Sequence, residues 1–298
     1  MYKKLLILPL AFSLASCSSK DENLDKLLKI TKDNMVFVKG GTFMMGDFGA
    51  TADIKDKYGY NLIGSPENRK KYPDVNWLPI LGNPDSRPLH KVTLSDFYIS
   101  KYEVTWEEFD LYTRLMGKEL YKKDKQDKNF RKKDRPVKVP SWNDAKSYCK
   151  YLAKKTEKNY DLPTEAQWEY SARSGGKYVY FATNTGRGIK NSDSLNPTKE
   201  PQNIVNSGTS LFKVGSLPSN PLGLFDMSGN ISEWTNDWYN KDYYTNSAIL
   251  NPKGPENGTM KVTRGGSSGY MEMTVFSRYP KDSISSSVGF RCVLNSKK

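Results

Sequence analysis

The chain has 298 residues, of which 37% are hydrophobic and 12% aromatic, enough for one large domain or two small ones. Its mean hydropathy of −0.71 excludes a polytopic membrane protein, and the many aromatic residues argue against wholesale disorder. A single histidine excludes sites built from two or three imidazoles, and three cysteines are too few for a disulfide-dense scaffold or a four-cysteine zinc site.

The N-terminus has the pattern of an export signal. Two lysines precede a short apolar stretch, residues 5–14, which is too brief for a stable membrane span. The sequence Leu14-Ala15-Ser16-Cys17 then resembles the bacterial lipobox, in which cleavage precedes an acylated cysteine. We therefore expect a lipoprotein signal peptide over residues 1–16, a lipidated Cys17 and a polar tether over residues 17–34. The alternatives are an ordinary secretory signal and an unprocessed N-terminus.

Export changes the interpretation of the formal charge of +13. A basic chain is typical of nucleic-acid binding, but an exported lipoprotein seldom meets nucleic acid. We expect the bacterial cell envelope as its location, facing the periplasm or the exterior. The lipid anchor makes the membrane one partner, and an envelope protein or a glycan is expected as another. Residues 118–138 carry ten of the Lys and Arg residues, and a solvated loop is favoured there over a dedicated binding patch.

Strands are predicted over residues 35–38 and 42–46, followed by a long surface excursion rich in Gly, Pro, Asn and Asp over residues 47–89. Residues 91–99 alternate and predict a bent strand. Capping boxes predict three helices, because a hydroxyl and an acid or amide three residues later satisfy free amides. These helices are expected over residues 105–116, 141–155 and 164–173.

From residue 175 onward, strand-length runs alternate with turns, and short strands are predicted over residues 262–264 and 288–294. No linker divides residues 35–298, so we expect a single α+β domain. In the second helix, Cys149 shares a face with Trp142, Ala145 and Leu152 and should point inward.

Several stretches, taken together and in order, resemble the formylglycine-generating enzyme family, also called the sulfatase-modifying factor family. They are residues 38–46, 97–105, 141–149, 162–170, 223–234, 264–267 and 289–292. The resemblance implies a variant C-type-lectin-like fold over residues 35–298, with short helices and much irregular structure. That expectation agrees with the elements predicted above.

The resemblance also implies a copper-binding cysteine pair just after the Gly-Gly-Ser stretch, which suits the preference of Cu(I) for thiolates. Residues 265–278 contain no cysteine, and Tyr270 and Val275 stand at about the positions of the pair. Met271 and Met273 are soft thioethers, but packing is favoured over copper binding. A second branch of the superfamily uses iron held by several histidines, and His90 is alone. We expect neither copper nor iron and assign no catalytic residue.

The resemblance implies two structural features. Cys149 and Cys292 correspond to a disulfide in the family, which suits an oxidising compartment, and two buried thiols are the alternative. Calcium is expected at the side chains of Asn230 and Glu233 and the backbone carbonyls of Ser228 and Ile231, with a turn and a Glu233 salt bridge as the alternative. A second calcium site would begin at Asn203 and Ile204, but residues 206–213 contain no acid.

These expectations favour a lipoprotein whose domain is a non-catalytic binding or structural module of the envelope. One alternative is a family oxidase, or another oxidoreductase, with an unusual centre. Another is a carbohydrate-binding module, which rests on analogy with the lectin-like fold.

Overall fold

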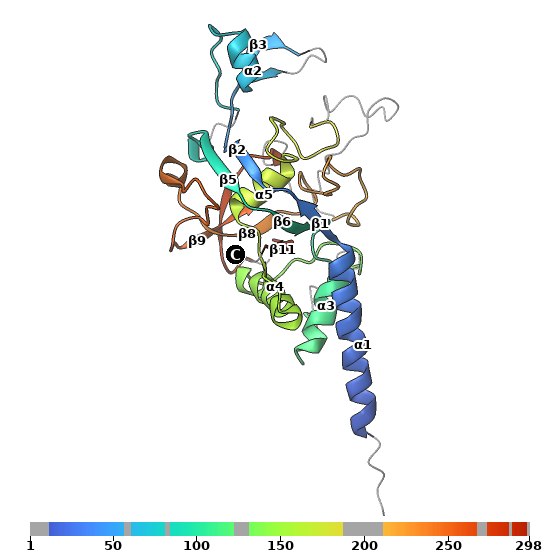
Figure 1. Cartoon of the computed structure of the whole chain (residues 1–298). Helices are drawn as coiled ribbons and strands as arrows, with labels where there is room; N and C mark the ends of the chain where they lie inside the picture. The colour runs from blue at the N-terminus through green and yellow to red at the C-terminus, as the bar shows by residue number, and fades with distance from the viewer. Residues whose placement is uncertain are drawn as a thin grey trace, which may run out of the picture.

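The computed structural model describes residues 12–56, 61–80, 84–121, 131–186, 211–266, 273–285 and 288–296. Small antiparallel sheets and short helices form the body, a lobe stands at one end of it, and a long helix extends from the other (Figure 1). The mixture of few helices, small sheets and long connections is the α+β architecture expected from the sequence.

A four-stranded sheet joins the beginning of the domain to its end. Its strands are β1 (Met35–Val38), β6 (Phe97–Ser100), β11 (Val293–Asn295) and β7 (Tyr160–Asp161), in that order. Every pair in the sheet is antiparallel. Pairing of β6 with both the first and the last strand closes the fold over nearly the whole domain.

Two further sheets carry the segments that the family resemblance highlighted. One has the order β10-β9-β8, built from β8 (Glu233–Trp238), β9 (Met260–Arg264) and β10 (Tyr279–Asp282). The other pairs β2 (Gly41–Met45) with β5 (His90–Leu94). The predicted bent strand is therefore two strands, β5 and β6, which belong to different sheets. Asp96 lies at the break, where its Oδ1 accepts the Gly40 N–H at 2.7 Å.

The three predicted helices are confirmed as α3 (Trp106–Leu115), α4 (Trp142–Thr156) and α5 (Glu165–Ala172). Thr105 and Thr164 complete reciprocal capping boxes at α3 and α5. Ser141 caps α4 by accepting the Asp144 N–H at 3.2 Å. Each cap satisfies amides that have no partner within the helix, which is why these boundaries were visible in the sequence.

The segment expected to be a loose tether is instead part of helix α1 (Phe12–Asp33). Leu27 is fully buried against the body, and Lys26 forms an ion pair with Glu107 of α3 at 2.7 Å. Leu28 and Ile30 pack against the same cluster, and this packing stabilises a helix whose polar composition gave no clear helical pattern. Cys17 falls within the span of α1, and its processing and lipidation stay predictions. Among the described residues, no helix is both long and apolar enough to cross a membrane.

The predicted excursion over residues 47–89 is a structured lobe (Figure 1). It contains β3 (Ala50–Lys55) paired with β4 (Asn61–Ile63), α2 (Pro66–Lys71) and a 3₁₀ turn at Pro84–Ser86. Its elements are too short and too polar to show a periodic pattern. The final predicted strand is also shorter than expected, because residues 288 and 289 form only isolated bridges.

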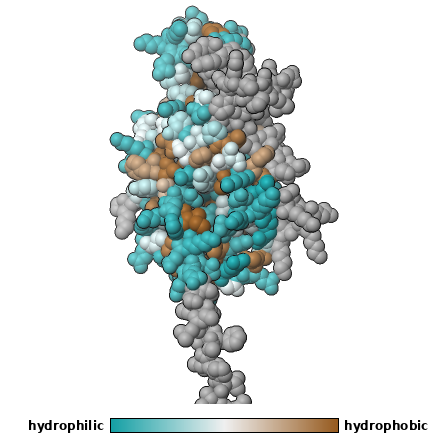
Figure 2. Space-filling model, turned by 90° about the vertical axis from the view of Figure 1, so that its right-hand side faces the viewer, coloured by the Kyte–Doolittle hydropathy of each residue, from teal (hydrophilic) through white to brown (hydrophobic). Residues whose placement is uncertain are grey.

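Among the described residues, two large apolar clusters form most of the core. One lies around α3 and α4 and includes Trp106, Tyr148 and Phe290. The other lies around α5 and the β2–β5 hairpin and includes Phe48 and Trp168. The face shown in Figure 2 is largely hydrophilic, with apolar patches between the polar side chains.

Candidate functional site

The segment where the family resemblance expects the redox centre begins at the end of β9. Arg264 is followed by Gly265 and Gly266, both with positive φ, at 90° and 61°. A Cβ on Gly265 would lie 3.2 Å from the Trp168 ring, so this turn requires glycine. The described chain resumes at Met273.

The described part of this segment has an apolar environment. Val275, at the position expected for one of the paired cysteines, is completely buried in the cluster that contains Phe48 and Phe276. Met273 is buried against Phe181. Tyr270 and Met271 lie outside the described residues. Within the described ranges, no group of three His, Cys, Asp or Glu side chains is arranged to hold a metal.

A buried network of ion pairs supports this segment. Glu165 and Glu169, one turn apart on α5, accept the two terminal nitrogens of Arg264 at 2.9 and 2.8 Å. Arg278 donates to both oxygens of Glu165 at 2.7 and 2.8 Å, and Arg173 donates to Glu169 at 3.0 Å. We call these five residues the α5 network. It fastens both ends of the segment to the same helix.

Glu165 and Arg278 hold each other in the ionised state. Burial raises the pKa of Glu165, but the guanidiniums of Arg278 and Arg264 outweigh burial and hold it below its ordinary value. For Arg278, burial lowers the pKa, but Glu165 outweighs this and raises it. All five side chains are buried, so the network is a structural support rather than a site open to substrate.

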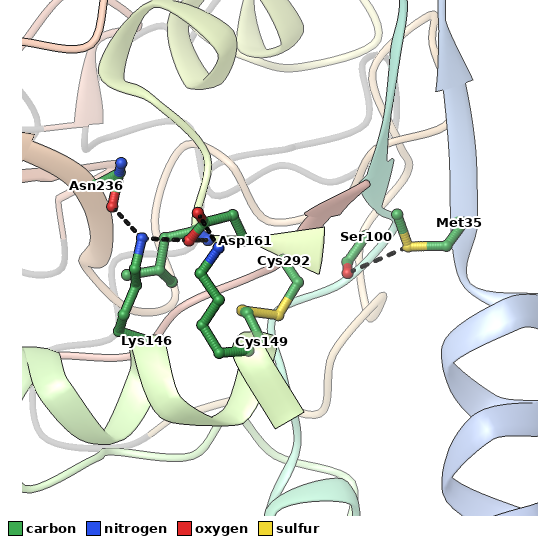
Figure 3. The surroundings of a disulfide bond; sticks show 9 residues. Met35, Ser100, Lys146, Cys149, Asp161, Asn236 and Cys292 are labelled. Carbon is green, nitrogen blue, oxygen red and sulfur yellow. Dashed lines mark hydrogen bonds and ion pairs between the residues drawn. A yellow bond between two sulfur atoms is a disulfide. The ribbon is translucent and has the colours of Figure 1, made fainter. Parts of the chain in front are cut away.

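Cys149 and Cys292 form a disulfide in the structure, with their Cα atoms 5.8 Å apart. The bond joins α4 to the chain just before β11 (Figure 3). Lys146, one turn earlier on α4, bridges Asp161 and Asn236 beside it. The two cysteines lie away from residues 265–278 in sequence and serve to fasten helix to sheet.

The residues expected to bind calcium are engaged with protein groups. Arg291 donates to both oxygens of Glu233 at 2.6 and 2.7 Å, and the Trp168 indole donates to one of them at 3.0 Å. Asn230 Oδ1 accepts the Phe212 N–H at 3.0 Å. Since its strongest expected ligand is already paired, this arrangement does not fit a calcium ion.

The remaining described residues of the two predicted calcium sites show no arrangement that favours a cation. The backbone carbonyls of Ser228 and Ile231 belong to buried residues, and the Ser228 hydroxyl accepts the Ala182 N–H at 2.8 Å. Asn203 and Ile204 lie outside the described residues. The alternative interpretation from the sequence, a turn with Glu233 in a salt bridge, describes the observed contacts.

His90 is the first residue of β5, and its ring contacts Pro88 and Tyr244. Its Nδ1 lies 3.0 Å from the Pro88 carbonyl oxygen, and its ring centroid lies 4.4 Å from that of Tyr244. Burial lowers the pKa of His90, which favours neutral imidazole.

The sequence analysis missed a cleft at the base of the lobe. It is lined by Asp47, Arg69, Trp77, Arg87, Pro88 and Leu89 and has a volume of about 530 Å³. Its residues come from the two ends and the middle of an excursion without periodic pattern. The clue that sequence offered was two arginines and a tryptophan within a stretch otherwise typical of a surface loop.

Comparison with known proteins identifies the relatives of this chain. The family model for a sulfatase-modifying factor enzyme 1-like domain matches residues 21–296. The formylglycine-generating enzyme of Bos taurus is 28% identical, over 78% of this chain and 78% of that protein. The serine/threonine-protein kinase pkn1 of Chlamydia pneumoniae is 27% identical, over 96% of this chain.

The chain spans only about half of that kinase relative, 48% of its length. Among solved structures, PvdO from Pseudomonas aeruginosa superimposes with a TM-score of 0.65 at 25% identity. The superposition covers 88% of this chain and 94% of PvdO. The fold is thus the variant C-type-lectin-like fold that the motifs implied.

Proposed function

Because the chain belongs to the sulfatase-modifying factor enzyme 1-like family, we propose a function that keeps the fold and abandons the oxidation chemistry. The protein is an exported lipoprotein, anchored through Cys17, whose domain is a non-catalytic binding or structural module of the cell envelope. The observation that carries this proposal is the lack of any cysteine in residues 265–278.

Three contacts support the non-catalytic role. Val275 fills an apolar site where the resemblance expects a thiolate. The only cysteines after Cys17 are joined to each other, so neither is a free thiol. The α5 network still fastens both ends of residues 265–278 to α5, which is expected of a fold that is retained for its shape.

The proposal is tested by incubating purified protein and copper with a peptide containing the sequence Cys-x-Pro-x-Arg. We expect no aldehyde product, which mass spectrometry would detect about 18 Da below the parent peptide for this class of chemistry. An active formylglycine-generating enzyme assayed in parallel is the positive control. Copper-dependent conversion that is lost in Tyr270→Phe or Met271→Leu would instead support an oxidase with an unusual centre.

The anchor is tested separately through Cys17→Ser, with Ser18→Ala as the matched control. Acyl chains bind membranes with about 0.8 kcal/mol per buried CH₂, so a multiply acylated cysteine gives lasting attachment. Cys17→Ser should release the protein from the membrane fraction, whereas Ser18→Ala should leave it there. Sedimentation of the Cys17→Ser protein with membranes after a salt wash would contradict the lipoprotein proposal.

A further inference from the structure

The cleft at the base of the lobe has more positive charge than its own acid can neutralise. Two arginines, Arg69 and Arg87, line it together with one carboxylate, Asp47. The carboxylate is fully buried and already accepts the N–H groups of Gly49 at 2.8 Å and Ile80 at 2.9 Å. Asp47 therefore holds the neck of the lobe and is poorly placed to satisfy both guanidiniums.

Arg87 lacks a full partner within the described part of the chain. Its Nε is buried without a hydrogen bond, and the nearest carboxylate oxygen, of Asp47, is 3.8 Å away. The Arg87 side chain is 32% exposed, so its charge is open to an oxyanion that enters the cleft.

Arg69 is held rigidly, but by neutral groups. Its Nε donates to the Gly64 carbonyl at 3.0 Å and its Nη2 to the Phe48 carbonyl at 2.8 Å. Its guanidinium lies over the Trp77 ring, 5.3 Å from the centroid. These contacts fix the position of the cation without neutralising its charge, so a second guanidinium is ready for an anion.

The remaining walls select the body of the ligand. Trp77, Pro88 and Leu89 offer apolar surface, and the volume of about 530 Å³ is that of a small-molecule site. A ligand ring can pack on Trp77 while an acid group on that ring pairs with Arg87, so the lining suits a ring that carries a carboxylate.

We infer that this cleft binds a ring-bearing carboxylate, the chemistry of a uronic acid in an acidic glycan. The carboxylate pairs with Arg87, Arg69 adds a second positive charge, and the ring packs on Trp77 and Leu89. The inference rests on the proposed binding role and names the class of molecule that is bound. Its test is independent of peptide oxidation, so the two can fail separately.

The experiment is calorimetric or NMR titration of the full protein with glucuronate, and with glucose as the neutral probe of the same ring. We expect a glucuronate Kd of about 1 mM or tighter, as the size of the ligand allows, and at least about tenfold weaker binding of glucose. High salt should weaken glucuronate binding, because the cleft is open to solvent.

Arg87→Gln should weaken glucuronate binding at least about tenfold, while Arg87→Lys, which keeps the charge, should lose less. Arg114→Gln, on the exposed side of α3, is the control and should bind as the parent does. Melting temperatures equal to that of the parent would show that the variants are folded, so that a change in affinity reports on binding. Equal affinity for glucose and glucuronate, no binding of either, or an undiminished affinity in Arg87→Gln would overturn the inference.

Discussion

Two buried groups of charges meet around α5 and β8, and they are balanced differently. In the α5 network, two carboxylates, Glu165 and Glu169, face three guanidiniums. In the second group, Arg291 is paired with Glu233. Glu103 and Asp226 lie close enough to repel each other, and both are attracted by Arg291. The first group has surplus cations and the second has surplus acids.

The imbalance decides which groups keep a proton. Burial, and then repulsion by Asp226, raise the pKa of Glu103 well above its ordinary value. Burial raises the pKa of Asp226 to about 6. Burial of both carboxyls, together with the repulsion of Glu103 by Asp226, therefore favours a proton on this pair. The α5 network is therefore expected to resist pH change, whereas the Glu103–Asp226 pair is expected to respond to it.

The largest expected loss of folding stability comes from removing the disulfide next to Arg291. Removing the neighbouring disulfide with Cys149→Ser and Cys292→Ser should cost roughly 5 kcal/mol on the chain-entropy model, because the closed loop exceeds 100 residues, and less if native strain intervenes. Urea unfolding measures the loss, and non-reducing peptide mapping should show the two cysteines linked. Quantitative alkylation of both thiols in the native, oxidised protein would contradict this.

Breaking the α5 network from its centre should have the next largest effect. Arg264→Met leaves Glu165 and Glu169 buried with fewer cations, and removing one partner of a buried pair typically costs about 3–5 kcal/mol. Arg114→Met, on an exposed position of α3, should change the free energy of unfolding by less than about 0.5 kcal/mol. Similar urea midpoints for the two variants would contradict the structural role of the network.

The pH response sharpens the comparison. Asp226 has a higher pKa folded than unfolded, so the folded state binds more protons and the free energy of unfolding falls as pH rises from about 4 to 6. Glu103→Gln removes one acid and can still accept the Asn230 amide. It should therefore raise stability relative to the parent more at pH 7 than at pH 4.5. Urea unfolding at the two pH values tests this, with the exposed Glu256→Gln as control. A pH-independent difference would refute the repulsion between the two carboxyls.

The smallest expected effect concerns calcium. Because Arg291 occupies both oxygens of Glu233, chelation should leave the melting temperature unchanged. Glu233→Gln should lower that temperature equally with calcium and with chelator, since it leaves Arg291 without its full partner. A stabilisation by calcium that disappears in Glu233→Gln would restore the calcium site implied by the family resemblance.

The sequence was sufficient wherever local chemistry determines structure. Thr105, Ser141 and Thr164 marked three helix starts, because a cap is a contact between residues three apart. Helix α1 and the lobe were not predicted, because contacts with residues far away in the sequence stabilise them, as the Lys26–Glu107 ion pair illustrates. The same limit applied to the site. The motifs containing Glu165 and Arg264 were visible, but their pairing across about a hundred residues was not.

The central claim is that the family fold persists here without a redox-metal centre. Its most direct test is the copper content of purified protein after incubation with Cu(I) and removal of unbound metal, measured against an active formylglycine-generating enzyme. We expect copper at background level in this protein and stoichiometric copper in the active enzyme. One copper per chain, lost when Met271 or Met273 is changed to leucine, would contradict the claim.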